Sequence, residues 1–254
     1  MLFFLRQVRR KLMNENKFTT YLLYAIGEII LVVVGILIAV QIDEWNKDQE
    51  AKATAKSFLI NLDAELGRNK VILEEIIQDN SSVILAGRRI LNIIGFDTIQ
   101  YDETEMSGLV TAAFAPIIIF QPNETVLSEL TTSGNIKNLE NPKLKSSLST
   151  FSSHLDVVRF QESIVQQDKE LCINELRRLG SMRTMFDISG ASAGYLEIYE
   201  GGKSNGNKKL LESNVFENNL LIYTASSTGL NNQYKATLVA MDSLSILIYK
   251  EINK

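Results

Sequence analysis

Residues 21–42 read YLLYAIGEIILVVVGILIAVQI, an apolar run of 22 residues that contains one ionisable side chain, Glu28. A helix needs about 20 apolar residues to cross the hydrocarbon core of a membrane. A cleaved signal peptide would have a shorter apolar stretch, about 7–15 residues, followed by a small-residue cleavage site. The residues after Ala39 offer no such site. The run therefore predicts a transmembrane helix that remains part of the protein.

The charges on the two sides of this run differ in sign. Residues 1–20 have a net charge of +4, whereas residues 43–254 hold 21 Lys and Arg against 28 Asp and Glu, a net charge of −7. Segments rich in Lys and Arg stay in the cytoplasm. We therefore expect the N-terminus inside the cell and the domain of residues 43–254 outside the cytoplasm. The acidic domain gives no electrostatic reason to expect a nucleic-acid partner.

The segment before the run, MLFFLRQVRRKLM, has large apolar side chains on one face of a helix and arginines largely on the other. Such a helix lies on a membrane surface, where its basic side chains meet anionic lipid. A plain cluster of positive charge that only fixes the orientation fits the same residues. On the first interpretation, residues 1–20 are a cytoplasmic basic amphipathic segment that contacts the bilayer through Arg6, Arg9, Arg10 and Lys11.

Glu28 is the most unusual residue of the predicted span. A carboxyl group inside a bilayer costs free energy unless it faces a partner helix or a polar cavity. Gly35 and Ala39 form a small-xxx-small pair, and Gly27 lies two turns before Gly35 on nearly the same face. Small residues let a second helix approach closely. We predict that the span associates with itself or with another membrane protein through Gly27, Glu28, Gly35 and Ala39. The simpler alternative is an isolated anchor with a protonated or snorkelling glutamate.

Three stretches of the remaining chain show the apolar spacing of three and four that is typical of α-helices. They cover residues 55–94, 143–179 and 215–252. The stripe of the second stretch is interrupted only at Glu162 and Lys169. The stripe of the first stretch is Phe58, Leu62, Leu66, Leu73, Ile76, Ile84, Leu91 and Ile94, with Asn69, Asn80 and Gly87 in its gaps.

Each of these helices would be roughly 50–60 Å long at 1.5 Å per residue, and lengths of this kind suit a bundle. The predicted fold class is mainly α, with one N-terminal transmembrane helix followed by an extracytoplasmic bundle of long helices.

Shorter elements are expected between the first two long helices. Residues 103–115 predict a helix, and Asn123 is a candidate N-cap of a further helix that ends near Gly134, where glycine suits the left-handed terminus. Asn141–Pro142 suits the start of the second long helix, because proline is favoured in a first helical turn. The apolar run of residues 117–120 is too short to assign.

The stretch of residues 180–206 contains six glycines and several serines and asparagines. This composition predicts a loop or a small excursion from the bundle. Within it, residues 195–199 read YLEIY, and the alternation of this run predicts a short strand.

Residues with catalytic or metal-binding chemistry are few and scattered. His154 is the one histidine and Cys172 the one cysteine, and both lie on or beside the stripe of the second long helix, where we expect structural roles. No cluster of His, Cys and carboxylate residues has metal-ligand spacing, and no glycine-rich loop suggests a phosphate site. Carboxylates from distant segments can still meet in space. We expect no catalytic residue, cofactor or metal, and therefore a protein that is not an enzyme.

The span and its flanks resemble a known family. The block YLLYAIGEIILVVVGILIAVQIDEWN, preceded by RRKLMNENKF, is similar to small membrane proteins of Gram-negative bacteria that are known as a domain of unknown function, family 6090. Residues 120–148 also resemble this family's Ser-Gly-Asn turn before a helix, whereas residues 151–153 depart from the aromatics often found there. The resemblance implies an inner-membrane anchor and a helical periplasmic domain, and it implies no activity.

Three functions are compatible with these features. The first is a non-catalytic interaction or scaffold protein that presents a helical bundle in the periplasm, with the lipid bilayer, a second copy or a membrane protein as its partner. The alternative is a sensor-like domain that binds a small ligand between helices. Such a domain would have to signal laterally, because the sequence has no second span and no cytoplasmic output domain. An envelope hydrolase is the third.

Overall fold

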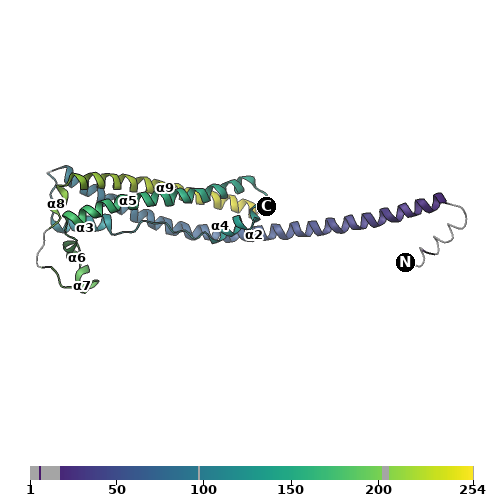
Figure 1. Ribbon diagram of the computed structural model, residues 1–254, viewed down its shortest axis with the longest axis horizontal. Coiled ribbons are helices and arrows are strands. Elements are labelled where there is room, and N and C mark those ends of the chain that lie inside the picture. Colours follow the sequence, from purple (N-terminus) through teal and green to yellow (C-terminus); the bar gives the residue numbers. More distant parts are fainter. Residues whose placement is uncertain (1–5, 7–17, 97, 202–205, 254) are drawn as a thin grey trace. The chain divides into compact units, whose positions relative to one another are not determined.

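The computed structural model describes residue 6 and residues 18–96, 98–201 and 206–253. The chain divides into two compact units, Met1–Ala55 and Lys56–Lys254. No strand occurs among the described residues, so the predicted mainly α fold is confirmed. In chain order the helices are α2 (Phe18–Gly95), α3 (Glu103–Phe114), α4 (Thr125–Thr132), the 3-10 helix η1 (Asn135–Asn138), α5 (Pro142–Leu179), α6 (Met182–Ile188), α7 (Ala191–Gly194), α8 (Lys208–Leu211) and α9 (Asn214–Ile252) (Figure 1).

The first unit contains the N-terminal part of α2. This helix is long and apolar enough to cross a membrane, and its most apolar stretch buries no residue inside the protein. The core helix of a soluble protein would bury such a stretch, because exposed apolar surface is unfavourable in water. By length, composition and exposure, the predicted span is therefore a helix suited to a bilayer.

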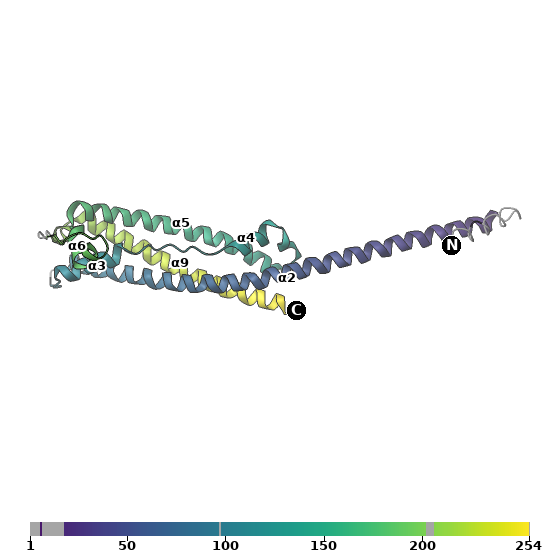
Figure 2. The ribbon, with the colours of Figure 1, turned by 90° about the horizontal axis from the view of Figure 1, so that it is seen from below.

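The second unit is a bundle of three long helices, namely α5, α9 and the part of α2 that follows Lys56 (Figures 1 and 2). α5 and α9 lie side by side and run in opposite directions. Asn141 N, at the start of α5, donates to Glu251 near the end of α9, and Ser213, at the start of α9, donates to Glu175 near the end of α5. The predicted stripes form the seams between these helices. Their fully buried members include Leu144, Leu148, Leu155, Val158 and Leu176 of α5 and Phe216, Leu220, Tyr223, Leu230 and Tyr234 of α9.

The seam of α2 differs from its predicted stripe by one position at each end. Leu59 and Ile90 are buried, whereas Phe58 and Leu91 are only half-buried. The central leucines of the stripe are buried as predicted. The reason is that several apolar positions of this helix are adjacent in sequence, and the pattern alone does not say which of two neighbours faces the bundle.

Local capping explains where the long helices of the bundle begin. The Asn141 side chain accepts hydrogen bonds from Lys143 N and Leu144 N at the start of α5, with proline in the first turn as predicted. The Ser213 side chain does the same for Phe216 N at the start of α9. Asn123 lies one residue before the N-cap of α4, so this predicted cap is displaced by one position.

The fourth position of the bundle is filled by α3, an extended segment of residues 115–124, and α4 (Figure 2). The extended segment alternates in the way that a strand does. Ile118 and Phe120 are buried, whereas Ile117 and Ile119 are exposed. An extended chain has no hydrogen bonds of its own, so its backbone groups need partners elsewhere in the bundle.

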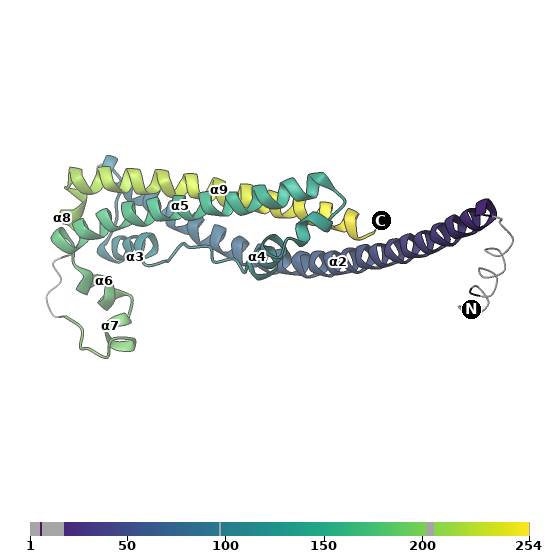
Figure 3. The same ribbon diagram turned by 45° about the vertical axis from the view of Figure 1, so that its right-hand side comes forward.

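Residues 180–201 of the predicted excursion are more ordered than predicted, since they contain α6 and α7 (Figure 3). The predicted strand at 195–199 is wrong. These residues follow α7 as irregular chain, and Glu197 has a positive φ of 54°. A strand needs a neighbouring strand to pair its backbone groups, and none lies among the described residues.

Candidate functional site

The residues predicted to associate in the membrane all lie on α2 within the first unit. A Cβ added at Gly27 or Gly35 would meet nothing within 4 Å. Glu28, Gly35 and Ala39 fall within about 40° of one another around the helix at 100° per residue, whereas Gly27 lies about 80° from Gly35. The helix thus presents one open line of Glu28, Gly35 and Ala39, flanked by Gly27.

The predicted membrane-surface segment is described only in part. Arg6 is helical and exposed. Arg9, Arg10 and Lys11 lie outside the described residues, so the interpretation of this segment stays a prediction.

The two residues that interrupt the stripe of α5 are buried in its seam. Glu162 Oε1 accepts hydrogen bonds from Phe120 N at 2.8 Å and from the Tyr234 hydroxyl at 2.6 Å. Lys169 Nζ donates to the Pro116 carbonyl at 2.6 Å. Both residues therefore hold the extended segment against α5, and they satisfy backbone groups that a helix would have satisfied internally.

Burial changes the ionisation of both side chains. It raises the pKa of the Glu162 carboxyl group, partly opposed by the hydrogen bonds from Tyr234 and Phe120. It lowers the pKa of the Lys169 ammonium group. Burial and the neighbouring carboxyl also raise the pKa of Tyr234. These shifts express the cost of placing charge in an apolar seam.

Two polar residues of α2 hold the other end of the extended segment. Asn69 donates to the Asn123 carbonyl at 2.7 Å and accepts from Asn123 N at 2.8 Å. Glu65 accepts from Val126 N at 3.0 Å and from Leu127 N at 3.3 Å. The N-cap residue of α4 forms no side-chain cap of its own, so Glu65 caps this helix from outside. Asn69 was predicted only as a gap in the stripe.

The single histidine and the single cysteine have structural surroundings, as expected. His154 Nε2 lies 2.8 Å from the Thr237 hydroxyl oxygen. Cys172 is buried, and burial raises the pKa of its thiol to about 12, which leaves it unreactive as a nucleophile. Within the described ranges, no group of three or more His, Cys, Asp or Glu residues could hold a metal ion.

The base of the α6–α7 excursion is fastened by Asn207, which is fully buried. Its Oδ1 accepts from Ser181 N at 2.8 Å, and its Nδ2 donates to Glu103 Oε1 at 2.8 Å. The approach is so close that a Cβ at Gly180 would lie 2.8 Å from Asn207 Oδ1. One side chain therefore joins both ends of the excursion to α3.

The excursion itself is organised around the carboxylate of Asp187. It accepts hydrogen bonds from the Ser192 hydroxyl, from Gly201 N at 2.9 Å and from Arg183 Nε at 3.0 Å. The Ser192 bond is the main reason why the pKa of Asp187 is lowered. α6, α7 and the chain after them are thus held together as one small body.

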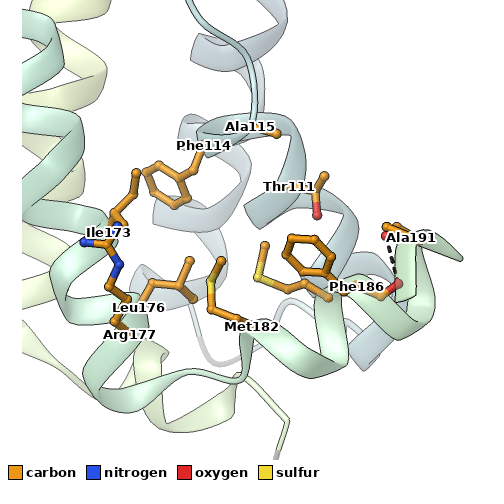
Figure 4. A pocket seen from close by; sticks show the side chains of 11 residues that line it. Thr111, Phe114, Ala115, Ile173, Leu176, Arg177, Met182, Phe186 and Ala191 are labelled. Carbon is orange, nitrogen blue, oxygen red and sulfur yellow. Dashed lines mark hydrogen bonds between the residues drawn. The ribbon is translucent and has the colours of Figure 1, made fainter. Parts of the chain in front are cut away.

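α6 and the end of α3 enclose a cavity of about 380 Å³ against α5 (Figure 4). Its walls are almost entirely apolar, and Arg177 is the charged residue that lines it. The lining comprises Thr111, Phe114, Ala115, Ile173, Leu176, Arg177, Met182, Met185, Phe186, Ser189 and Ala191. Ligand sites typically have volumes of about 300–1,000 Å³ and mostly apolar walls, so this cavity is a candidate ligand site.

Comparison with known families now adds one result. A model described as "Family of unknown function (DUF6090)" matches residues 28–155, which is 128 of the 254 residues. The chain belongs to DUF6090. The resemblance inferred from the span and its flanks is thereby confirmed. No curated protein and no solved structure matches the chain.

The DUF6090 match covers only part of the candidate site. It includes α3, the extended segment and α4, and it ends within α5. Glu162, Lys169 and the walls that α5 and α6 contribute to the cavity lie beyond residue 155. The cavity could not be predicted from the sequence, because its walls come from segments about 60 residues apart that meet only in the folded bundle.

Proposed function

We propose that this DUF6090 protein is a non-catalytic interaction or scaffold protein, anchored in the bacterial inner membrane, that presents its helical unit in the periplasm. The observation that carries the proposal is the apolar stretch of α2, which buries no residue. Basic residues precede this stretch and an acidic segment follows it. Retention of positive charge in the cytoplasm then favours an extracytoplasmic position for Lys56–Lys254.

The interior polar residues support a binding role over a catalytic one. Glu65, Glu162 and Lys169 all bond to main-chain groups of the extended segment or of α4. A general acid or base must reach a proton of its substrate. These side chains hold the extended segment and α4 in the fold, which is the role expected of buried polar groups that have hydrogen-bond partners.

Exposed aromatic residues on the α6–α7 excursion also support an interaction role. The side chains of Tyr195 and Tyr199 are 82% and 96% exposed, and those of Leu196 and Ile198 are exposed as well. Tyrosine is enriched in protein interfaces, and neighbouring exposed apolar side chains are typical of interaction surfaces.

The topology can be tested with reporters fused after Lys254 in the full-length protein. A reporter that is active only in the periplasm should be active, and one that is active only in the cytoplasm should be inactive. The reverse pattern would overturn the proposed location.

The interaction can be tested by mild solubilisation of the membrane and affinity isolation of the full chain. A defined partner, or a second copy of this chain, should return in fixed proportion. Recovery of the monomer alone, with no partner even after cross-linking in the intact cell, would overturn the interaction role.

Association within the membrane is the more specific part of the proposal. Gly35→Ile should strongly lower association in a membrane two-hybrid assay, because its side chain fills the open line beside Glu28. Glu28→Gln should largely preserve association, since glutamine can still form an interhelical hydrogen bond. Val33→Ile, on the opposite face of the helix, is the matched control. Equal association of Gly35→Ile and Val33→Ile would show that this line is not an interface.

The sensor-like role is a second candidate, because the cavity at α3, α5 and α6 favours it. A domain of this kind would bind a small apolar molecule between its helices. Binding at this cavity would also alter the excursion that carries the exposed tyrosines, since α6 forms one of the cavity walls.

A further inference from the structure

The cavity between α3, α5 and α6 reaches side chains of the buried core. It encloses about 380 Å³, yet Phe114, Leu176 and Met185 in its walls are each no more than 6% exposed. Figure 4 shows the side chains of Phe114, Leu176 and Met182 pointing toward the same space from the three helices. A flat protein surface does not reach walls that are buried to this extent, so a slender molecule fits the cavity better than a partner's surface does.

The hydroxyl groups of the lining are already satisfied. Thr111 Oγ1 donates to the Ser107 carbonyl at 2.8 Å, and Ser189 Oγ donates to the Phe186 carbonyl at 3.1 Å. These groups belong to the turns of their own helices. The interior of the cavity therefore provides apolar contacts for a ligand, and its hydroxyl groups do not need hydrogen bonds from that ligand.

Two methionines make one wall adaptable. Met182 (Figure 4) and Met185 both belong to α6 and line the cavity. Methionine has three rotatable bonds and a polarisable sulfur, and it adjusts to irregular apolar shapes. A flexible hydrocarbon chain is the kind of ligand that such a wall accommodates.

Arg177 supplies the charge at one edge of this apolar space. Its Nη1 donates to Glu170 at 2.6 Å and to Asn174 at 3.1 Å. Its Nε and Nη2 form no hydrogen bond with any residue in the described part of the chain. A guanidinium group binds carboxylates and phosphates through paired N–H groups, so an anionic head group fits this edge and a cationic one does not.

We propose that this cavity binds a single-chain anionic amphiphile, with its aliphatic chain among Phe114, Leu176 and Met185 and its head group on Arg177. At roughly 30 Å³ for each non-hydrogen atom, the volume accommodates about 12 atoms of the aliphatic chain, and the head group lies outside this volume at Arg177. A medium-chain fatty acid has this size and charge. The proposal rests on the sensor-like role above and names its ligand class.

The experiment uses the full-length protein in bilayers of neutral lipid and a photoreactive dodecanoate whose reactive group is at the end of the chain. After illumination, mass spectrometry should place the label on the cavity walls of α6 or α3. Met185→Trp fills the cavity and should lower labelling about tenfold. Leu171→Trp, at an exposed position of α5, should label like the parent. Ala115→Leu fills the cavity from α3 and serves as a second variant if Met185→Trp does not fold.

The head group is tested with Arg177→Gln. This variant should label about tenfold less with the dodecanoate probe, the effect of losing roughly one charged hydrogen bond. It should label like the parent with the corresponding uncharged dodecanol probe. Arg178→Gln is the matched control, because Arg178 bonds to Glu175 and does not line the cavity.

Labelling that is spread over the bundle, or that persists in both filled-cavity variants, would overturn the site. Equal labelling by the acid and the alcohol, with no effect of Arg177→Gln, would overturn the anionic head group. Labelling of α2 alone would assign the probe to the bilayer and overturn the proposal. Because these measurements need neither a protein partner nor the periplasm, a failed interaction or topology test remains distinguishable from a failed ligand test.

Discussion

Replacing Glu162 with leucine should destabilise the second unit by about 1–4 kcal/mol. The substitution removes the acceptor of two buried donors, Phe120 N and the Tyr234 hydroxyl, which lie 2.8 Å and 2.6 Å from Glu162 Oε1. A buried donor without a partner costs roughly 1–3 kcal/mol. Part of this loss is offset because leucine buries apolar surface and no carboxylate has to be desolvated.

Glu162→Gln should stay within about 1 kcal/mol of the parent protein, because the amide oxygen can accept the same two hydrogen bonds. It should also change the pH dependence of stability. Burial raises the pKa of Glu162 above its ordinary value of 4.5, so the folded protein holds this proton more tightly than the unfolded chain does. The contribution of Glu162 to the free energy of unfolding is fully present below pH 4.5 and is lost as the pH rises through the raised pKa.

The assay is denaturant unfolding of the full chain in a mild detergent, followed by circular dichroism between about pH 4 and pH 8. The free-energy difference between Glu162→Gln and the parent should shift in favour of the variant as the pH rises. Lys169 is common to both proteins, so its lowered pKa does not affect the comparison. Gln167→Leu, at an exposed position of the same helix, should change stability by less than about 0.5 kcal/mol. The reasoning fails if Glu162→Leu unfolds at the same denaturant concentration as the parent, or if the parent and Glu162→Gln have identical pH profiles.

Three further perturbations test the packing of the second unit by the same unfolding assay. Gly87→Ala should cost about 1–3 kcal/mol, because the new Cβ would lie 2.6 Å from Thr224 Oγ1. Adding Thr224→Ala should remove this cost. Additive effects of the two substitutions on the free energy of unfolding would contradict the contact. Asn207→Ala should cost about 1–3 kcal/mol, because Ser181 N loses its acceptor and Glu103 Oε1 loses the Nδ2 donor, while the bonds to Glu103 from the backbone N of residue 207 and from Ser107 remain. Unchanged stability would mean that the excursion is not fastened there. Tyr223→Phe should cost about 1 kcal/mol, because the Ala113 carbonyl loses its hydroxyl donor at 3.0 Å; a gain in stability would argue against this bond.

The long helices were predictable because local chemistry and packing agree on them. Helices were expected at residues 143–179 and 215–252, and the structure has Pro142–Leu179 and Asn214–Ile252. α5 begins at Pro142, as the proline in the first turn predicted, and the Asn141 side chain caps it. An apolar spacing of three and four over roughly ten turns, interrupted in α5 only at Glu162 and Lys169, favours a helix over any other conformation.

The role of the polar residues in the seams was not predictable from the same pattern. Glu162 and Lys169 fit the helical spacing of α5, but their backbone partners, Phe120 and Pro116, lie 42 and 53 positions earlier. The sequence of residues 116–120 does not itself show that this segment is extended or against which helix it packs. The mistaken strand at 195–199 has a related cause. Alternating apolar and polar residues fit an extended chain with two different faces, but a strand also needs a neighbouring strand to pair its backbone groups.

The extended segment also bears on how far the bundle can be shortened. Its backbone at Pro116 and Phe120 is held by Lys169 and Glu162, whereas its backbone at Asn123 is held by Asn69. A chain truncated at residue 155, where the family match ends, would keep the last of these attachments and lose the other two. It would also lack α9, against which α5 packs. The stretch that defines family membership is therefore smaller than the stretch that must fold as a unit, and a recombinant domain of any use has to extend through the end of α9.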